Sequence, residues 1–211
     1  MVDLRKGCKT ELANTKILDL DWENPKLYAE WLAQTYYYAA ITTRIIGLAG
    51  CHFQYEQDDL HNKFLDHARE ERHHEKMLIN DIKGLGFSLE QFKACSSSNI
   101  LFQNQYYWIQ NVNPIAVYGY FLYLEGLAVT AGPDIFARVK TAHPEKSTRY
   151  LKVHVEEDIG HVDGHYAFID KLSQAEQNWI HQNLVQTSYL YRNMLYEVVK
   201  NTASHALKKV S

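Results

Sequence analysis

Four side chains with metal-binding chemistry are spaced at helical intervals in the C-terminal half of the chain. His154, Asp158, His161 and His165 follow one another at intervals of four, three and four residues. An α-helix places residues at these intervals on one face, each a turn beyond the last. Imidazole and carboxylate groups gathered on one face are typical ligands of first-row transition metals. The segment therefore predicts a helix that carries part of a metal site.

A second segment, residues 67–75, repeats this pattern with three histidines and three glutamates, of which Glu70 and Glu71 are adjacent. Its candidate ligands are His67, Glu70, Glu71 and His74. On a helix, both histidines and one of the glutamates share a face. His74 is the first candidate and Glu71, three residues earlier, is the next, while His67 and Glu70 compete for the remaining place. Two such segments in one chain predict a metal site built inside a helix bundle.

A single carboxylate interrupts the most apolar part of the chain. Between residues 115 and 129, Glu125 is the only charged residue. A helix that is apolar on all sides is a buried helix, and an unpaired buried carboxylate is costly or takes up a proton. Glu125 therefore needs a partner. A metal ion is the partner that the two histidine segments favour, and an ion pair with Arg44 is the alternative.

A solvated helix face of mixed charge is the alternative explanation of the first segment. Against it, apolar residues between Leu151 and Phe168 mark a core direction close to that of the histidines. The histidines therefore point inward or sideways. We expect His154, Asp158 and His161 to bind metal, while His165, a full turn beyond His161, stays outside the predicted ligand set.

Length and composition limit the remaining classes of protein. The chain has 211 residues and a net charge of −3, and we expect one domain over residues 1–211, with residues 1–22 as an N-terminal extension. No basic block suggests nucleic-acid binding, and no apolar stretch suggests a signal peptide or a membrane span. Three scattered cysteines form no disulfide framework or zinc motif, which favours a cytoplasmic protein.

Apolar periodicity and helix-capping residues predict helices almost throughout. No segment alternates as a half-buried strand would, so we predict an all-α bundle of about seven to eight helices. The expected helices cover residues 24–51, 56 to 84 or 86, a short segment from 88, 101–110, 114 to 126 or 131, 133–141, 144–172 and 173–205, with a loop at 95–99.

These motifs together resemble a known group of metal enzymes. A helix with E-x-x-H, a middle helix with one glutamate, and a helix with H-x-x-x-D-x-x-H are similar to the heme-oxygenase-like diiron oxidases and oxygenases. That group belongs with the iron-containing redox enzymes and is akin to the TenA and PqqC proteins. The resemblance covers most of the chain and implies a heme-oxygenase-like helical bundle.

The resemblance assigns candidate ligands position by position. The matching residues are Glu71, His74, Glu125, His154, Asp158 and His161. Some members of the group have a glutamate separated from the first-helix histidine by six residues. At that position this chain has His67. The first metal's ligand shell therefore departs from that variant of the pattern, and His67 completes the predicted ligand set. The site is then diiron, mononuclear, or completed only with substrate.

The resemblance also implies cofactors, partners and one further residue. Two irons per chain are expected, with manganese as the alternative, and the partners are dioxygen, a small-molecule substrate and a second copy of the chain in a homodimer. Tyr150 lies one turn before His154 and is the candidate catalytic residue. Some members of the group use a metal-adjacent tyrosine as a source of para-aminobenzoate. A hydrogen-bond donor beside the ligands is the role that we favour.

Two other functions remain open at this stage. One is a metal-free TenA-like or PqqC-like enzyme of cofactor metabolism, although TenA-like chemistry needs a cysteine nucleophile and Cys51 and Cys95 have no evident nucleophile context. The other is a non-catalytic binding protein of the same fold. A heme enzyme is disfavoured, because residues 24–51 contain no histidine to hold heme iron.

Overall fold

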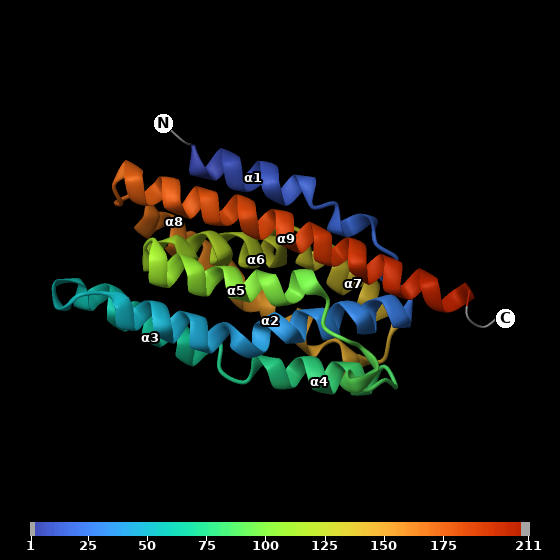
Figure 1. The fold of residues 1–211 in the computed structure, drawn as a ribbon. Helices are drawn as coiled ribbons and strands as arrows, with labels where there is room; N and C mark the ends of the chain where they lie inside the picture. The colour runs from blue at the N-terminus through green and yellow to red at the C-terminus, as the bar shows by residue number, and fades with distance from the viewer. Residues whose placement is uncertain (1–2, 208–211) are drawn as a thin grey trace.

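The computed structural model describes residues 3–207, without the side chains of residues 157, 159 and 204–207. Figure 1 shows its helices, and the predicted all-α class is confirmed. The α-helices are α1 (Leu4–Asn14), α2 (Pro25–His52), α3 (Asp58–Glu70), α4 (His74–Gly84), α5 (Ser96–Asn111), α6 (Tyr118–Thr130), α7 (Gly132–Ala142), α8 (Arg149–Ile169) and α9 (Gln174–Leu207). Short 3₁₀ turns are η1 (Ile17–Asp19), η2 (Tyr55–Gln57), η3 (Leu89–Gln91), η4 (Pro114–Val117) and η5 (Glu145–Ser147).

The described part of the chain has nine α-helices, slightly more than the seven to eight predicted. One reason is α1, which forms inside the region predicted as an extension. Asp3 caps it by accepting a hydrogen bond from the Lys6 amide. The other reason is a break in the helix predicted from residue 56 to residue 84 or 86. His73 adopts a left-handed backbone with φ of 79°, which ends one helix and starts the next.

The segment predicted as a loop at residues 95–99 is also different in the structure, because α5 already begins at Ser96. Serine and asparagine favour turns and caps when the chain is considered locally. Here Ser98 is buried, and its hydroxyl donates to the Gln34 side chain of α2 at 2.9 Å. Tertiary contact therefore extends the helix beyond its local preference.

Helix α6 is the centre of the bundle. It packs against α8 and α9 and also contacts α1 and α7, while α2 packs against α3, α4, α5 and α9 (Figure 1). Most residues of α6 are buried around its whole circumference, as expected for a helix that is apolar on all sides. Any charged side chain on α6 is therefore held inside the protein by its neighbours.

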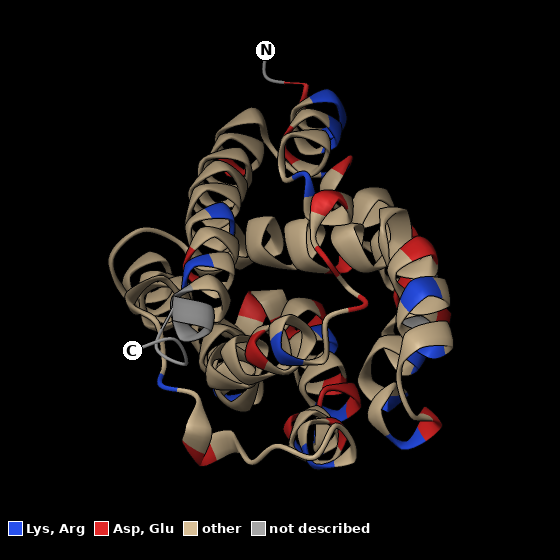
Figure 2. Cartoon of the chain, turned by 90° about the vertical axis from the view of Figure 1, so that its right-hand side faces the viewer, with Lys and Arg blue, Asp and Glu red and all other residues tan. Residues whose placement is uncertain are grey.

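The surface carries both signs of charge. Figure 2 shows Lys and Arg interspersed with Asp and Glu along the helices that face the viewer. Within the described residues, no single helix is long and apolar enough for a membrane span. Two consecutive segments, Pro114–Thr130 and Gly132–Ala142, reach the length and composition of a membrane span only when they are taken together, and they are bent by 55° relative to each other.

The contact between α6 and α9 depends on Gly119. A Cβ atom at this position would lie 2.3 Å from the Ile180 carbonyl oxygen and 2.5 Å from the Leu184 amide nitrogen. Both are backbone atoms of α9 and cannot move aside cheaply. The closeness of these two helices therefore requires a residue without a side chain at position 119.

We predict that Gly119→Ala lowers the free energy of unfolding by about 1–3 kcal/mol through overpacking. Gly47→Ala is the matched control, since nothing lies within 4 Å of a Cβ there. In the interior of α2, alanine should stabilise the protein by about 0.5–1 kcal/mol. Urea unfolding of both variants measures the difference. Equal effects of the two substitutions would contradict the proposed helix contact.

Candidate metal centre

Four helices and one helix break bring the sequence-predicted ligands together inside the bundle. Helix α3 supplies His67, the break after α3 supplies Glu71, and α4 begins with His74. Helix α6 supplies Glu125. Helix α8 supplies the ladder: His154, Asp158, His161 and His165.

The first cluster consists of Glu71, His74 and His154. One ligand atom from each residue lies within 4.8 Å of those of the other two. The Glu71 Oε2 atom is 3.1 Å from His74 Nδ1, and the His74 and His154 rings lie 4.9 Å apart. His154 Nδ1 donates to the Tyr150 carbonyl at 2.9 Å, which leaves Nε2 as the atom that can bind a metal.

The second cluster consists of His67, Glu125 and His165, whose ligand atoms also lie within 4.8 Å of one another. The two oxygens of Glu125 face different histidines: Oε1 is 3.5 Å from His67 Nε2, and Oε2 is 2.9 Å from His165 Nε2. His161 completes this side. Its Nδ1 is 3.6 Å from Asp158 Oδ1 and 4.0 Å from Glu125 Oε2.

Glu71 connects the two clusters. Its Oε2 atom faces His74 in the first cluster, and its Oε1 atom is 3.8 Å from His67 Nε2 in the second. The helix break places Glu71 at this point, because the chain turns there between α3 and α4. A carboxylate with one oxygen toward each cluster is suited to hold two metal ions side by side.

The histidines carry buried nitrogen atoms that lack a hydrogen bond. These atoms are His67 Nε2, His161 Nδ1 and His165 Nδ1. Buried polar atoms are normally satisfied, so each such atom needs an explanation. Imidazole and carboxylate donors suit iron or manganese, and a metal ion would satisfy nitrogens of this kind. The residues therefore fit a metal centre.

The pKa values of the ionisable side chains are strongly perturbed. Burial raises the pKa of Glu125 to about 8, and burial together with the nearby His67 and Lys63 lowers the pKa of His165 to about 3. Asp158 raises the pKa of His161 to about 9. Burial acts to raise the pKa of Glu71, but the contacts with His67 and His74 outweigh it. The pKa of Glu71 therefore lies well below its ordinary value. Such perturbation is typical of functional sites.

The structure resolves two alternatives that the sequence leaves open. Of the paired glutamates, Glu71 faces the clusters, while the side chain of Glu70 is 56% exposed at the outer edge. Arg44 is exposed, and the partners of the buried Glu125 are His67 and His165 instead. All seven predicted ligands lie at one centre. That they bind metal stays a prediction.

His165 is the residue that the predicted ligand set lacks. The signal was present, since His165 follows His161 by four residues on the same helix face. Helical spacing alone places His165 a full turn beyond His161 and does not show how far the site extends along α8. Glu125, however, lies deep in α6, and the long packing contact of α6 with α8 brings His165 against it.

A buried aspartate fixes the start of the helix that carries the ladder. Asp81 of α4 is fully buried, and its Oδ2 atom accepts a hydrogen bond from the Tyr150 amide at 2.8 Å. Burial raises the pKa of Asp81 from 3.8 to about 6. Asp81 therefore ties α4, which begins with His74, to the first turn of α8.

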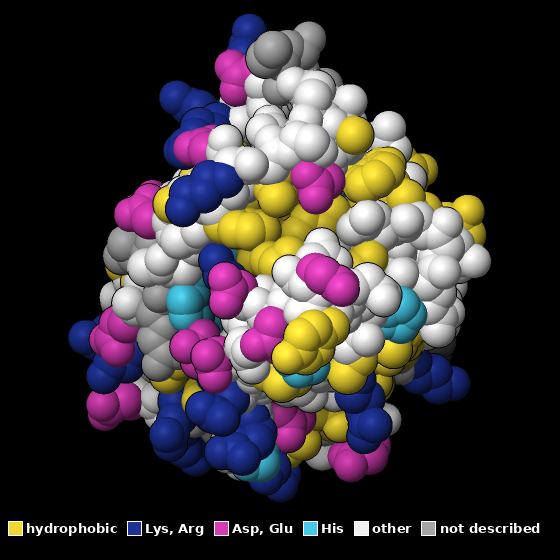
Figure 3. Space-filling model, turned by 90° about the vertical axis from the view of Figure 1, so that its left-hand side faces the viewer, with side chains coloured by type: hydrophobic (Ala, Val, Ile, Leu, Met, Phe, Trp, Pro, Cys, Tyr) yellow, Lys and Arg dark blue, Asp and Glu magenta, His cyan; other side chains and the backbone are white. Residues whose placement is uncertain are grey.

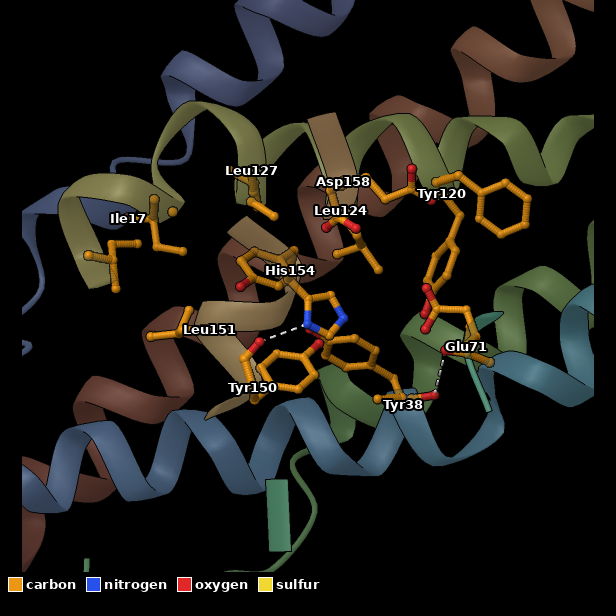
Figure 4. Close-up of a pocket in the computed structure, with 18 of the residues that line it drawn as sticks. Ile17, Tyr38, Glu71, Tyr120, Leu124, Leu127, Tyr150, Leu151, His154 and Asp158 are labelled. Atoms are coloured by element: carbon orange, nitrogen blue, oxygen red, sulfur yellow. Dashed lines mark hydrogen bonds between the residues drawn. The ribbon is translucent and has the colours of Figure 1, made fainter. Parts of the chain in front are cut away.

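Two cavities adjoin the centre. The first, about 90 Å³, is lined by Glu71 and His154 of the first cluster and by His67 and Glu125 of the second. Figure 4 shows His154 projecting into it above Tyr150. Its walls are mostly aromatic and aliphatic side chains, among them Tyr38, Tyr120 and Leu124. The second, about 440 Å³, lies between α3 and α8 against His67, His161 and His165.

Tyr150, the predicted catalytic residue, lines the first cavity with its ring centre 4.0 Å from that of His154. Burial raises its pKa well above the ordinary value for tyrosine. The phenol therefore keeps its proton and can only act as a hydrogen-bond donor or a neutral acceptor at neutral pH. A catalytic role for Tyr150 stays a prediction.

Comparison with known proteins agrees with this geometry. The sequence profile of the iron-containing redox enzymes matches residues 29–191. The chain belongs to this family. A search of curated proteins found no match.

Solved structures with low sequence identity share the fold. A heme oxygenase-like domain of unknown function from Shewanella denitrificans has a TM-score of 0.82 at 19% identity, over 95% of this chain and 90% of that one. A TenA homologue from Pseudomonas syringae has a TM-score of 0.77 at 13% identity, over 93% and 91%. A CADD-like protein of unknown function from Nostoc punctiforme has a TM-score of 0.70 at 13% identity, over 96% and 95%. The predicted heme-oxygenase-like fold is therefore confirmed.

We predict that Asp81→Asn changes the pH dependence of stability. Because the folded-state pKa of Asp81 is raised, its contribution to stability is present below about pH 4 and is lost as the pH rises through about 6. The metal-free variant should therefore gain about 2–3 kcal/mol relative to the metal-free wild type between pH 4 and pH 7. Urea unfolding across this range measures it, and a difference independent of pH would contradict it.

We predict that His165→Ala lowers the iron bound after anaerobic reconstitution from about two ions per chain to about one, because the second cluster loses a ligand. Metal counting measures this, and circular dichroism should show unchanged helicity. His52→Ala is the control, since His52 is exposed at the end of α2. Full iron content in His165→Ala would make His165 a structural residue.

Proposed function

We propose that this protein is a nonheme diiron oxidase or oxygenase that uses dioxygen to oxidise a small molecule. The observation that carries the proposal is the pair of adjoining histidine and carboxylate clusters joined by Glu71. Membership of the iron-containing redox enzymes supports the choice of iron and of redox chemistry. We propose in addition that the chain acts in the cytoplasm as a homodimer, the first because its cysteines are free and the second by resemblance to the family.

The protein residues hold and orient the metal pair. Glu71, His74 and His154 would hold one ion, and His67, Glu125 and His165 would hold the other, with Glu71 facing both. Asp158 and His161, 3.6 Å apart, would complete the second side. When bound, a reduced iron pair supplies the electrons for reaction with dioxygen. The hydrogen bond that His154 Nδ1 donates to the Tyr150 carbonyl fixes that imidazole ring for this task.

The first cavity is suited to hold the part of the substrate that reacts. Its volume of about 90 Å³ is well above the roughly 10–15 Å³ needed to hold one water molecule, so it accommodates a small organic group. Apolar walls exclude water from that group. The phenol of Tyr150 keeps its proton beside His154 and can donate a hydrogen bond to a polar atom of the substrate.

A metal-free, thiol-dependent reaction is less consistent with the structure. No described cysteine lines either cavity at the centre. Cys51 is exposed, and Cys95 is buried with its pKa raised to about 12 by burial and nearby carboxylates. Cys8 lies against α6, and burial raises its pKa as well. A nucleophilic thiol needs a lowered pKa and access to substrate.

We predict that the wild-type protein binds about two Fe²⁺ per chain without oxygen and consumes dioxygen when air is admitted. Glu71→Ala should bind less than one ion and consume no dioxygen, because Glu71 serves both clusters. An oxygen electrode and metal counting measure the two quantities. His52→Ala again provides the control. Failure of the folded wild-type protein to bind iron would overturn the proposed function.

A further inference from the structure

The second cavity adjoins the metal centre and is lined by a different set of side chains from the first. It lies between α3 and α8 and shares only His67 and Phe121 with the first cavity among the described lining residues. Figure 3 shows the end of the molecule at which α3 begins and α8 ends, where acidic and histidine side chains lie close together near a hydrophobic hollow. Two separate cavities at one centre suggest two separate uses.

Two glycines form the mouth of this cavity on the α8 side. Gly160 and Gly164 are exposed, one turn apart, and line the cavity beside His161 and His165. Each glycine in a helix interior costs about 1 kcal/mol relative to alanine. Nothing lies within 4 Å of a Cβ built at either position, so helix packing does not require them. What these glycines provide is open space over the histidines.

The charge around the mouth favours a cation. Three carboxylates line the cavity, from Asp59, Asp66 and Glu70, against one ammonium group from Lys63. Asp66 also pairs with Arg69 at 3.4 Å, which leaves a smaller surplus of negative charge. Such a surplus of one sign concentrates counter-ions at a concave surface. The first cavity is also lined by carboxylates, from Glu71, Glu125 and Asp158, but these belong to the candidate ligands. In the second cavity Asp59, Asp66 and Glu70 are exposed to solvent.

The acidic groups lead inward to the ligands. Glu70 is 56% exposed, and its Oε2 atom lies 3.5 Å from His161 Nε2. The other nitrogen of His161 is 4.0 Å from Glu125 Oε2. Oxygen and nitrogen donors therefore follow one another from the solvent, through the half-buried His161, to the buried carboxylate.

A buried side chain at the floor of the cavity independently points to a ligand. The side chain of His165 is only 7% exposed. Its Nε2 faces Glu125, while its Nδ1 is buried without a hydrogen bond. A nitrogen held in this way next to an open cavity is available for a cation that arrives through it.

We infer that the second cavity is the port through which Fe²⁺ reaches the metal centre, with Glu70 as the first ligand that the ion meets and His161 as the next. The inference rests on the proposed function, since it assumes that the two clusters bind iron. It assigns Glu70 a role in the rate of metal loading rather than in holding the final pair.

The first test fills the mouth without touching a ligand. Gly160→Leu combined with Gly164→Leu places two side chains over the cavity, where open space receives them. We expect anaerobic Fe²⁺ uptake to slow on the order of tenfold or more, because close-packed side chains leave no passage for an ion. A colorimetric chelator added at timed intervals measures the iron still outside the protein.

The matched control is Gly160→Ala combined with Gly164→Ala. Alanine, like leucine, has a higher helix propensity than glycine, but its side chain is small. We therefore expect the uptake rate of this variant to stay within about twofold of that of the wild type. Both double variants should reach the wild-type iron content after long incubation. Uptake by the leucine variant at the wild-type rate would overturn the port, and so would a permanent loss of iron in that variant alone, because the glycines would then shape the centre itself.

The second test removes the charge of the first ligand. Glu70→Gln should slow uptake on the order of tenfold at low ionic strength, with unchanged final iron content. Added salt should slow the wild type more than the variant, because it screens exposed charges. Glu56→Gln is the control, since Glu56 is an exposed carboxylate outside the cavity.

The outcomes separate the port from the proposed function. If every variant takes up iron at the wild-type rate and to the wild-type content, the metal centre stands and the port is wrong. If the folded wild-type protein binds no iron at all, both are wrong. Slower uptake in the leucine variant and in Glu70→Gln, with normal final content, supports both.

Discussion

The burial of Glu71 and Glu125 among histidines is the constraint on which the rest of this structure depends. A buried carboxylate needs positive, hydrogen-bonding or coordinating partners, or it takes up a proton. The protein provides these partners from α3, α4 and α8, and the helices must therefore meet at one depth. The helix break after Glu70, the tie of Asp81 to the start of α8, and the close approach of α6 to α9 all serve that arrangement.

Much of the fold and of the centre could be predicted from the sequence, because both depend on regular helical spacing. The ladder on α8 and the lone glutamate of α6 are recognisable in one dimension. The break at His73 is not, because a left-handed histidine inside a helical pattern has no local signal of its own. The start of α5 and the place of His165 were missed for a related reason: contacts with Gln34 and Glu125, far away in the sequence, decide them.

The centre has two unlike sides. On the side of Glu71 and His154, aromatic and aliphatic residues form most of the walls of a small cavity. On the side of His161 and His165, a larger and more open space borders exposed carboxylates. One environment favours apolar groups and the other favours small cations. Under the proposed function, an ion and an organic molecule would then enter by different routes and would not compete.

The shared position of Glu71 has a consequence for the proposed diiron centre. One side chain that faces both clusters would lose its remaining conformational freedom when a first ion arrived, so a second ion would meet a carboxylate that is already ordered. This would be positive cooperativity without any change of fold. Since ions that bind only the folded chain also stabilise it, occupancy and folding form one thermodynamic cycle. The abundance of the folded protein in a cell would then follow the supply of its metal.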